Sequence, residues 1–157
     1  MIMMKKILLG AALCGLSTYA CANDDIVFQC TLKQDREKIE VIRHDKGIYV
    51  SYMTPQEAKM DEGGRHLSLT LGSDIIEQSV AGNTSQGFRS YTLKFQSDEM
   101  AQPHYIGYEW IDGKYSASYY TVDGKGDTVN LSDCQPKTIK ADGLLLSSGI
   151  DGIPEIP

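Results

Sequence analysis

Three histidines, one loop serine and several carboxylates could do chemistry in this sequence, but none stands in a familiar catalytic spacing. His44, His66 and His104 are far apart and form neither an H-x-H nor an H-E-x-x-H pattern. A metal site assembled by the fold is the alternative that this spacing leaves open. We expect each histidine at the surface or at a strand edge, without a ligand role, and we predict no metal and no cofactor.

Ser85 lies in a segment with a partial likeness to a nucleophile elbow. Residues 82–87 read Gly-Asn-Thr-Ser-Gln-Gly, which is one residue longer than the G-x-S-x-G turn. The elbow also requires a helix after the serine, whereas the chain from Phe88 onward alternates as a strand does. We therefore predict a loop between two strands, with no catalytic role for Ser85.

Carboxylates gather in two glycine-containing segments, residues 61–64 and 123–127. The second segment lacks the further acids and the terminal glutamate of a calcium-binding loop, and its length suits a hairpin turn. We expect both segments to be solvated loops. Because the sequence indicates no nucleophile, base or metal site, it predicts a protein that is not an enzyme. An enzyme is the alternative only if some of the histidines, Ser85 and the acids meet in one pocket.

Aromatic residues are concentrated on either side of Asp112-Gly113, a pair typical of a tight hairpin turn. Alternation would place Tyr108 and Trp110 on one side of the first strand, with Tyr115 and Tyr119 alternating along its partner. Exposed tyrosines beside a tryptophan are typical of recognition surfaces, because they offer rigid contact area with a polar tip. Cross-strand packing within the hairpin is the alternative. Tyr108, Trp110 and Tyr119 are accordingly candidate binding residues.

Strands must position these side chains, and the sequence predicts nine short ones. Apolar and polar residues alternate over 66–72 and 91–95. Further segments rich in β-branched or aromatic residues are 26–32, 38–43, 48–53, 75–80, 104–111, 114–122 and 128–131. Residues 55–60 could form one or two helical turns, with Thr54 as the cap. This pattern predicts an all-β fold, either a small antiparallel β-barrel or a sandwich.

The first 22 residues have the three parts of a secretory signal peptide. Lys5 and Lys6 precede an apolar stretch over 7–16 and the small-residue end Ala20-Cys21-Ala22. The apolar stretch is well short of the roughly 20 residues that span a bilayer, so no transmembrane segment is expected. We predict export to the bacterial periplasm, with cleavage after Ala22 in preference to lipidation at Cys21.

Cleavage would remove two lysines and no acids, so the formal net charge would move from −6 to −8. This balance argues against a nucleic-acid partner or an anionic lipid surface. It suits a cationic protein partner, and the alternative is that it serves only to keep the protein soluble.

Cys30 and Cys134 would be the two cysteines left after cleavage, and in an oxidising compartment they are expected to pair. The disulfide would join the first strand to the last one and close a loop of about 100 residues, which the chain-entropy model values at about 4 to 5 kcal/mol. We expect an antiparallel β domain over 23–134. Residues 135–157, rich in proline and glycine, are expected to be a weakly ordered C-terminal tail, although its three leucines could pack back as an edge strand.

Segments at both ends of the predicted domain resemble a known family. Val27-Phe28-Gln29-Cys30, together with the VNLSDCQ sequence of 129–135, is similar to the bracketing cysteine pattern of small periplasmic inhibitors of c-type lysozyme, the membrane-bound and soluble kinds. The resemblance implies a small antiparallel barrel that blocks lysozyme by placing a loop in its active-site cleft. In that family the loop carries a serine and a glycine shortly before a tyrosine. The nearest counterparts here are Ser85, Gly87 and Tyr91, at a different spacing.

These observations lead us to expect a periplasmic binding or inhibitory protein that acts by surface contact. Its candidate target is a cationic, lysozyme-like enzyme that degrades the envelope, towards which an acidic domain would be steered. The alternative is a structural or assembly component of the envelope without catalysis, which uses an exposed strand edge or the tail of 135–157.

Overall fold

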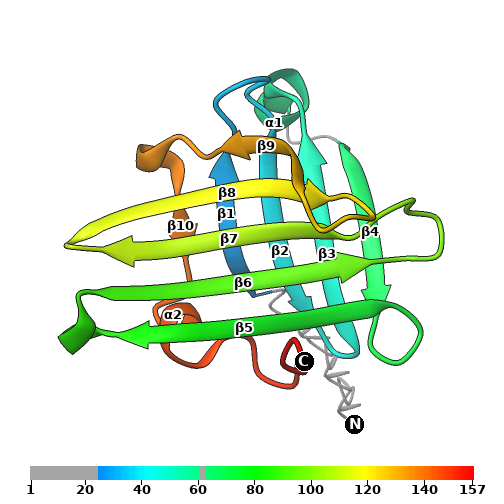
Figure 1. The fold of residues 1–157 in the computed structure, drawn as a ribbon. Coiled ribbons are helices and arrows are strands. Elements are labelled where there is room, and N and C mark those ends of the chain that lie inside the picture. The colour runs from blue at the N-terminus through cyan, green and yellow to red at the C-terminus, as the bar shows by residue number, and fades with distance from the viewer. Residues whose placement is uncertain (1–24, 61–62) are drawn as a thin grey trace, which may run out of the picture.

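The fold consists of two five-stranded antiparallel sheets packed face to face (Figure 1). The computed structural model describes residues 25–60 and 63–157; the predicted signal peptide, its cleavage site, Asp61 and Glu62 lie outside this part of the chain. The strand order is β10-β1-β2-β3-β4 in the first sheet and β5-β6-β7-β8-β9 in the second. Strands of one sheet run across those of the other (Figure 1). This arrangement confirms the all-β prediction and agrees with its sandwich form.

All nine predicted strands are present, most of them at nearly the predicted bounds. The first sheet contains β1 (Ile26–Thr31), β2 (Lys38–His44), β3 (Gly47–Met53), β4 (Arg65–Thr70) and β10 (Lys140–Ala141). The second sheet contains β5 (Ile75–Asn83), β6 (Phe88–Gln96), β7 (His104–Ile111), β8 (Lys114–Val122) and β9 (Thr128–Asp133). Only the two-residue strand β10 was not predicted, because two residues are too few to show alternation.

Two of the hairpins, β7–β8 and β2–β3, require a glycine, each for a different reason. At the β7–β8 turn, Asp112 and Gly113 have φ angles of 47° and 82°, the left-handed pair that a two-residue hairpin requires. Gly47 begins β3 with an ordinary φ, but a Cβ there would lie 1.8 Å from the backbone oxygen of Leu69. Glycine is therefore needed at position 47 because β4 approaches so closely.

Helix α1 (Pro55–Met60) follows β3 as the sequence predicts. The Thr54 hydroxyl accepts the Glu57 N–H at 3.3 Å, and the Glu57 carboxylate accepts the Thr54 N–H at 2.8 Å, which makes a reciprocal capping box. The α-helices in residues 25–60 and 63–157 are short. No helix in these ranges is long and apolar enough to cross a membrane.

The inner faces of the two sheets form one apolar core. Val50 and Phe95, from opposite sheets, are fully buried, and Leu93 and Ile106 are almost so. Cys30 of β1 and Cys134, which follows β9, form the predicted disulfide with a Cα–Cα distance of 5.7 Å. The disulfide therefore joins an inner strand of the first sheet to the edge of the second.

The C-terminal segment differs from the weakly ordered tail expected for 135–157. It forms η2 (Pro136–Thr138), β10 and α2 (Leu145–Ser148), and β10 pairs with β1 through Ala141 and Phe28. Four apolar side chains of the segment are buried in the core: Leu145, Leu146, Ile150 and Ile153. Burial of this apolar surface outweighs the loop-like composition, and the leucine run forms a short helix rather than a strand.

Candidate functional site

The turns between β5 and β6 and between β7 and β8 lie side by side at one end of the second sheet (Figure 1). We call residues 83–89 and 110–115 the hairpin end. The Asp112 N–H donates to the Gly87 carbonyl at 3.1 Å, and Phe88 pairs with Ile111 in the strand register. The two turns are therefore joined directly to each other.

Hydrogen bonds within the first turn hold Ser85 and Gly87 in place. The turn is a single 3₁₀ turn, η1 (Thr84–Gln86), whose cap Asn83 accepts the Gln86 N–H at 3.0 Å. The Ser85 hydroxyl donates to the same Asn83 oxygen at 2.6 Å. Gly87 ends the turn with φ 75°. As predicted, the segment is a loop between two strands, and the Ser85 hydroxyl is bonded to an amide oxygen rather than to a base.

Large apolar side chains are exposed at the hairpin end. Phe88 is 38% exposed, Ile111 47% and Tyr115 53%. Phe88 and Ile111 are adjacent on the outer face of the sheet, while Tyr115 lies on the inner side of the strand that follows the turn. Apolar groups that stay in water at a loop tip are available to a partner.

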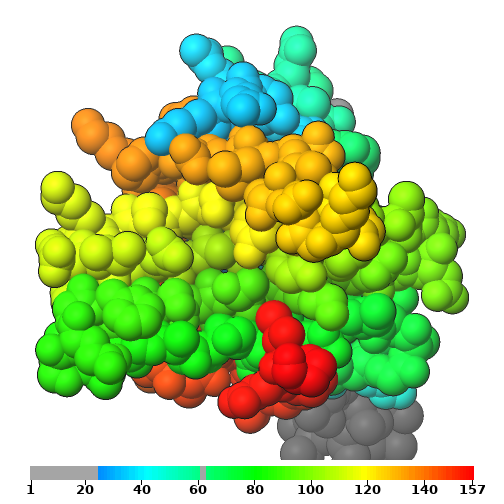
Figure 2. Space-filling model, viewed as in Figure 1, coloured from blue at the N-terminus to red at the C-terminus, as the bar shows by residue number. Residues whose placement is uncertain are grey.

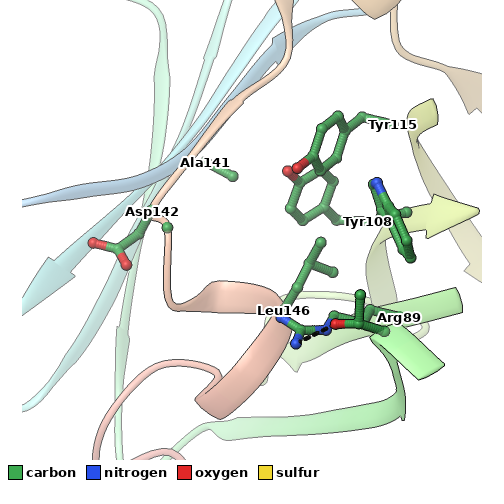
Figure 3. Close-up of a pocket in the computed structure, with 9 residues that line it drawn as sticks. Arg89, Tyr108, Tyr115, Ala141, Asp142 and Leu146 are labelled. Carbon is green, nitrogen blue, oxygen red and sulfur yellow. Dashed lines mark hydrogen bonds between the residues drawn. The ribbon is translucent and has the colours of Figure 1, made fainter. Parts of the chain in front are cut away.

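Beneath the hairpin end, between the second sheet and the C-terminal segment, is a cavity of about 390 Å³. One wall is aromatic and comes from β7 and β8, and the other comes from the segment around β10 and α2 (Figure 3). Its lining residues are Thr84, Arg89, Tyr108, Trp110, Tyr115, Ala141, Asp142, Gly143 and Leu146. The rings of Tyr108 and Tyr115 are nearly parallel, at 14°, with their centroids 5.8 Å apart.

Two charged side chains, Arg89 and Asp142, belong to this lining and differ in direction. Arg89 reaches towards Leu146 on the cavity side, and its Nη2 donates to the Thr84 hydroxyl at 2.7 Å (Figure 3). Asp142 points away from the tyrosines (Figure 3). Its Oδ1 accepts the Leu144 N–H at 2.8 Å. The charge that faces the cavity is therefore positive.

The candidate binding residues predicted from the sequence lie in four environments, and Tyr119 alone occupies the last of them. Ser85 and Gly87 are at the turn, and Trp110 is half-buried in the cavity wall. Tyr91, the counterpart of the inhibitory-loop tyrosine, is 2% exposed, and Tyr108, a candidate for the recognition surface, is 8% exposed, so both side chains are buried. Both side chains are at positions of their strands that face the core, where they pack against apolar residues. Burial also raises the pKa of the Tyr91 hydroxyl above its usual value.

Tyr119 lies apart from the hairpin end, in a polar contact between the two sheets. Its hydroxyl bonds to Nδ1 of His104 on β7 and lies 3.4 Å from the Tyr52 hydroxyl of β3. The Arg65 guanidinium lies over the Tyr52 ring, 5.4 Å from the centroid, and pairs with Glu37. Tyr119 therefore joins the sheets and is not part of the exposed hairpin end.

Acid is expected to weaken the fold through His104. Partial burial lowers the His104 pKa below its ordinary value, so the folded protein favours the neutral ring whereas the unfolded chain takes up a proton near pH 6.5. The stability that depends on neutral His104 should be complete above about pH 6.5 and be lost as the pH falls towards the lower folded-state pKa. Urea unfolding midpoints between about pH 7.5 and pH 5 would measure this loss.

The control for this prediction is His66→Asn, which removes an exposed histidine from β4. His104→Asn should reduce the acid dependence of the midpoint, and His66→Asn should leave it as in the wild type. If the urea unfolding midpoint changed with pH to the same extent in all three proteins, the assignment to His104 would be contradicted.

The histidines lie on three different strands, β2, β4 and β7. His44 stacks on Tyr49, with ring centroids 4.6 Å apart, and His66 pairs with Ser51 of β3. In the described ranges, no three His, Cys, Asp or Glu side chains are grouped so that they could hold a metal ion.

Sequence reasoning missed Arg89, Phe88 and Ile111. Arg89 precedes Tyr91 by two positions, so strand alternation predicts that both side chains point inward. The cavity that Arg89 faces could not be predicted, because residues more than 50 positions later complete it. Phe88 and Ile111 become neighbours only through the strand register.

Comparison of the chain with protein-family models, curated proteins and solved structures found no match.

Proposed function

We propose that this protein is a non-catalytic binding protein of the bacterial envelope that acts through its hairpin end. The observation that carries the proposal is the exposure of Phe88 and Ile111 side by side at the joined turns. In protein interfaces, a few side chains near the centre of the contact supply most of the binding energy.

The rigidity of the hairpin end supports the same function. The Asn83 cap, the Arg89–Thr84 bond and the Asp112–Gly87 bond fix both turns before any partner arrives. Ordering a loop on binding costs free energy, and a loop that is already ordered avoids much of that cost. A rigid loop of this kind is suited to insertion into a cleft of another protein.

We propose a lysozyme-like enzyme as the target. The terminal cysteine pattern resembles that of the periplasmic lysozyme inhibitors, and Ser85 and Gly87, the nearest counterparts of their inhibitory loop, lie at the hairpin end. The acidic chain, with a formal net charge of −6 before any cleavage, would attract a cationic enzyme and increase the association rate at low salt. In 135–157, Leu145 and Leu146 are buried and Leu144 is 65% exposed, so we favour the hairpin end over a free tail as the contact surface.

A lysozyme activity assay with purified residues 23–157 tests the proposal. We expect inhibition of a c-type enzyme at micromolar concentration. Ile111→Ala should weaken the inhibition by roughly 5- to 30-fold, since a central apolar contact is worth about 1 to 2 kcal/mol. Ile75→Ala is the matched control, because Ile75 is similarly exposed, at 42%, on β5 of the same sheet but at its other end.

Three results would count against this assignment. Absence of inhibition of c-type, g-type and i-type enzymes would remove the lysozyme target. Equal weakening by Ile111→Ala and Ile75→Ala would remove the hairpin end as the contact surface. Inhibition that persists unchanged in a Phe88→Ala, Ile111→Ala double variant would do the same.

A further inference from the structure

We infer that the cavity beneath the hairpin end is a binding site for a small organic carboxylate with a flat, largely apolar ring. The inference does not depend on the proposed protein target, because it concerns side chains that face inward rather than the exposed outer face. A volume of about 390 Å³ lies within the range of roughly 300 to 1,000 Å³ that is usual for small-molecule sites.

The charge in the cavity indicates the acidic group of the ligand. Arg89 keeps its charge at any physiological pH and carries five N–H donors in a planar fork. One donor is used on Thr84, and none of the ion pairs of the described chain includes Arg89. The nearby carboxylate of Asp142 is turned away from the tyrosines (Figure 3) and accepts the Leu144 N–H. A ligand carboxylate would provide the acceptor that the guanidinium fork lacks.

The walls of the cavity indicate the remainder of the ligand. The parallel rings of Tyr108 and Tyr115 form one side with Trp110, and Leu146 of α2 faces them (Figure 3). Flat aromatic surfaces favour another flat ring, through stacked or edge contacts. Because the lining supplies one cation, it suits a monoanion better than a phosphate, which would bring a second negative charge.

The chain contains its own reporter for this site, since Trp110 in the cavity wall is its single tryptophan. Tryptophan fluorescence can therefore follow a titration with phenylacetate, which has a carboxylate on a flat apolar ring. Phenylacetamide has the same ring without the charge, and glucuronate has a carboxylate on a polar ring. We expect a saturable change at up to millimolar phenylacetate, because small fragments bind weakly. Phenylacetamide and glucuronate should bind at least several-fold more weakly.

Two substitutions assign the binding to the cavity. Arg89→Gln should weaken phenylacetate binding by roughly 10- to 100-fold, the usual range for a charged hydrogen bond. Tyr115→Ala removes one wall while leaving the Arg89–Thr84 bond, and it should weaken binding several-fold. Lys114→Gln is the control, because Lys114 is an exposed cation at the adjacent turn whose side chain does not line the cavity.

Each outcome decides one part of the inference. Phenylacetamide binding as tightly as phenylacetate would overturn the role of the carboxylate, and tighter binding of glucuronate would overturn the apolar ring. No saturable fluorescence change, or the same affinity in Arg89→Gln and in the wild type, would overturn the site itself. A failure of lysozyme inhibition would leave these titrations unaffected, so the two proposals can be separated.

Discussion

Removing the disulfide by a Cys30→Ala, Cys134→Ala double substitution is expected to lower the free energy of unfolding by about 4 to 5 kcal/mol. The cross-link spans 104 residues, and so it restricts a large part of the unfolded chain. Small domains have net stabilities of about 5 to 15 kcal/mol, so the variant should be only marginally stable. The free energy of unfolding is measured by urea unfolding followed by circular dichroism. The dependence of this free energy on urea concentration is compared between the two proteins.

The native state without the cross-link should remain similar in structure, because hydrogen bonds surround the junction. The Cys134 N–H donates to the Ala117 carbonyl at 2.8 Å, and the Gln135 N–H donates to the Thr31 carbonyl at 2.8 Å. The main effect is therefore expected on the unfolded chain rather than on the folded structure.

The reduced wild-type protein is the control that separates the cross-link from the change of side chain. Both cysteines are buried, at 1% and 3% exposed, so alanine would also leave a small void. Reduced wild type and the double variant should lose similar stability, with the variant slightly less stable. A loss below about 1 kcal/mol in both would contradict the chain-entropy argument.

Strand positions could be predicted here because alternation is a local property of the sequence. The nine strands, the Asp112-Gly113 turn and the Thr54 cap all depend on residues within a few positions of one another. The grouping of strands into two sheets follows from contacts between distant segments, and nothing in a local pattern specifies it. The sequence could thus indicate an all-β fold without choosing between a barrel and a sandwich.

The direction of the tyrosines shows why the site was only partly predictable. Alternation separates Tyr105 and Tyr120 from Tyr108 and Tyr119, but it does not say which set faces the core. The structure places Tyr105 and Tyr120 as a stacked pair with centroids 5.1 Å apart, on the opposite face of β7 and β8 from the core. Both sets are amphipathic, so composition could not decide between the faces.

The C-terminal segment was predicted incorrectly because its partners lie far away in the chain. Composition describes its prolines and glycines, whereas in the fold its apolar side chains are buried and a buried glutamine of β5 bonds to its backbone. The Gln78 N–H donates to the Pro154 carbonyl at 2.8 Å, and the Gln78 carbonyl accepts the Ile156 N–H at 2.7 Å. In Figure 2 the last residues, in red, lie against β5, in green. A polar residue in a strand gives no local sign of such a role.

Replacing Gln78 by leucine is expected to lower the free energy of unfolding by about 3 kcal/mol, because three buried side-chain hydrogen bonds would be lost. Nε2 donates to the carbonyls of Ile150 and Ile153, each at 2.9 Å, and Oε1 accepts the Ile150 N–H at 2.8 Å. Leucine fills a similar volume but leaves these backbone groups unpaired in the core. Urea unfolding measures the loss, and amide hydrogen exchange locates it.

Gln96→Leu is the graded control, since Gln96 of β6 makes one partly buried side-chain bond, to the Met100 carbonyl at 3.2 Å. It should cost about 1 kcal/mol. In Gln78→Leu, protection should fall first at the Ile150 and Ile156 amides while the β2–β3 pairing stays protected. Uniform loss of protection across both sheets would show that Gln78 supports the whole core rather than anchoring the C-terminal segment. A segment that stays protected would show that the apolar burial of Leu145 and its neighbours is sufficient to hold it.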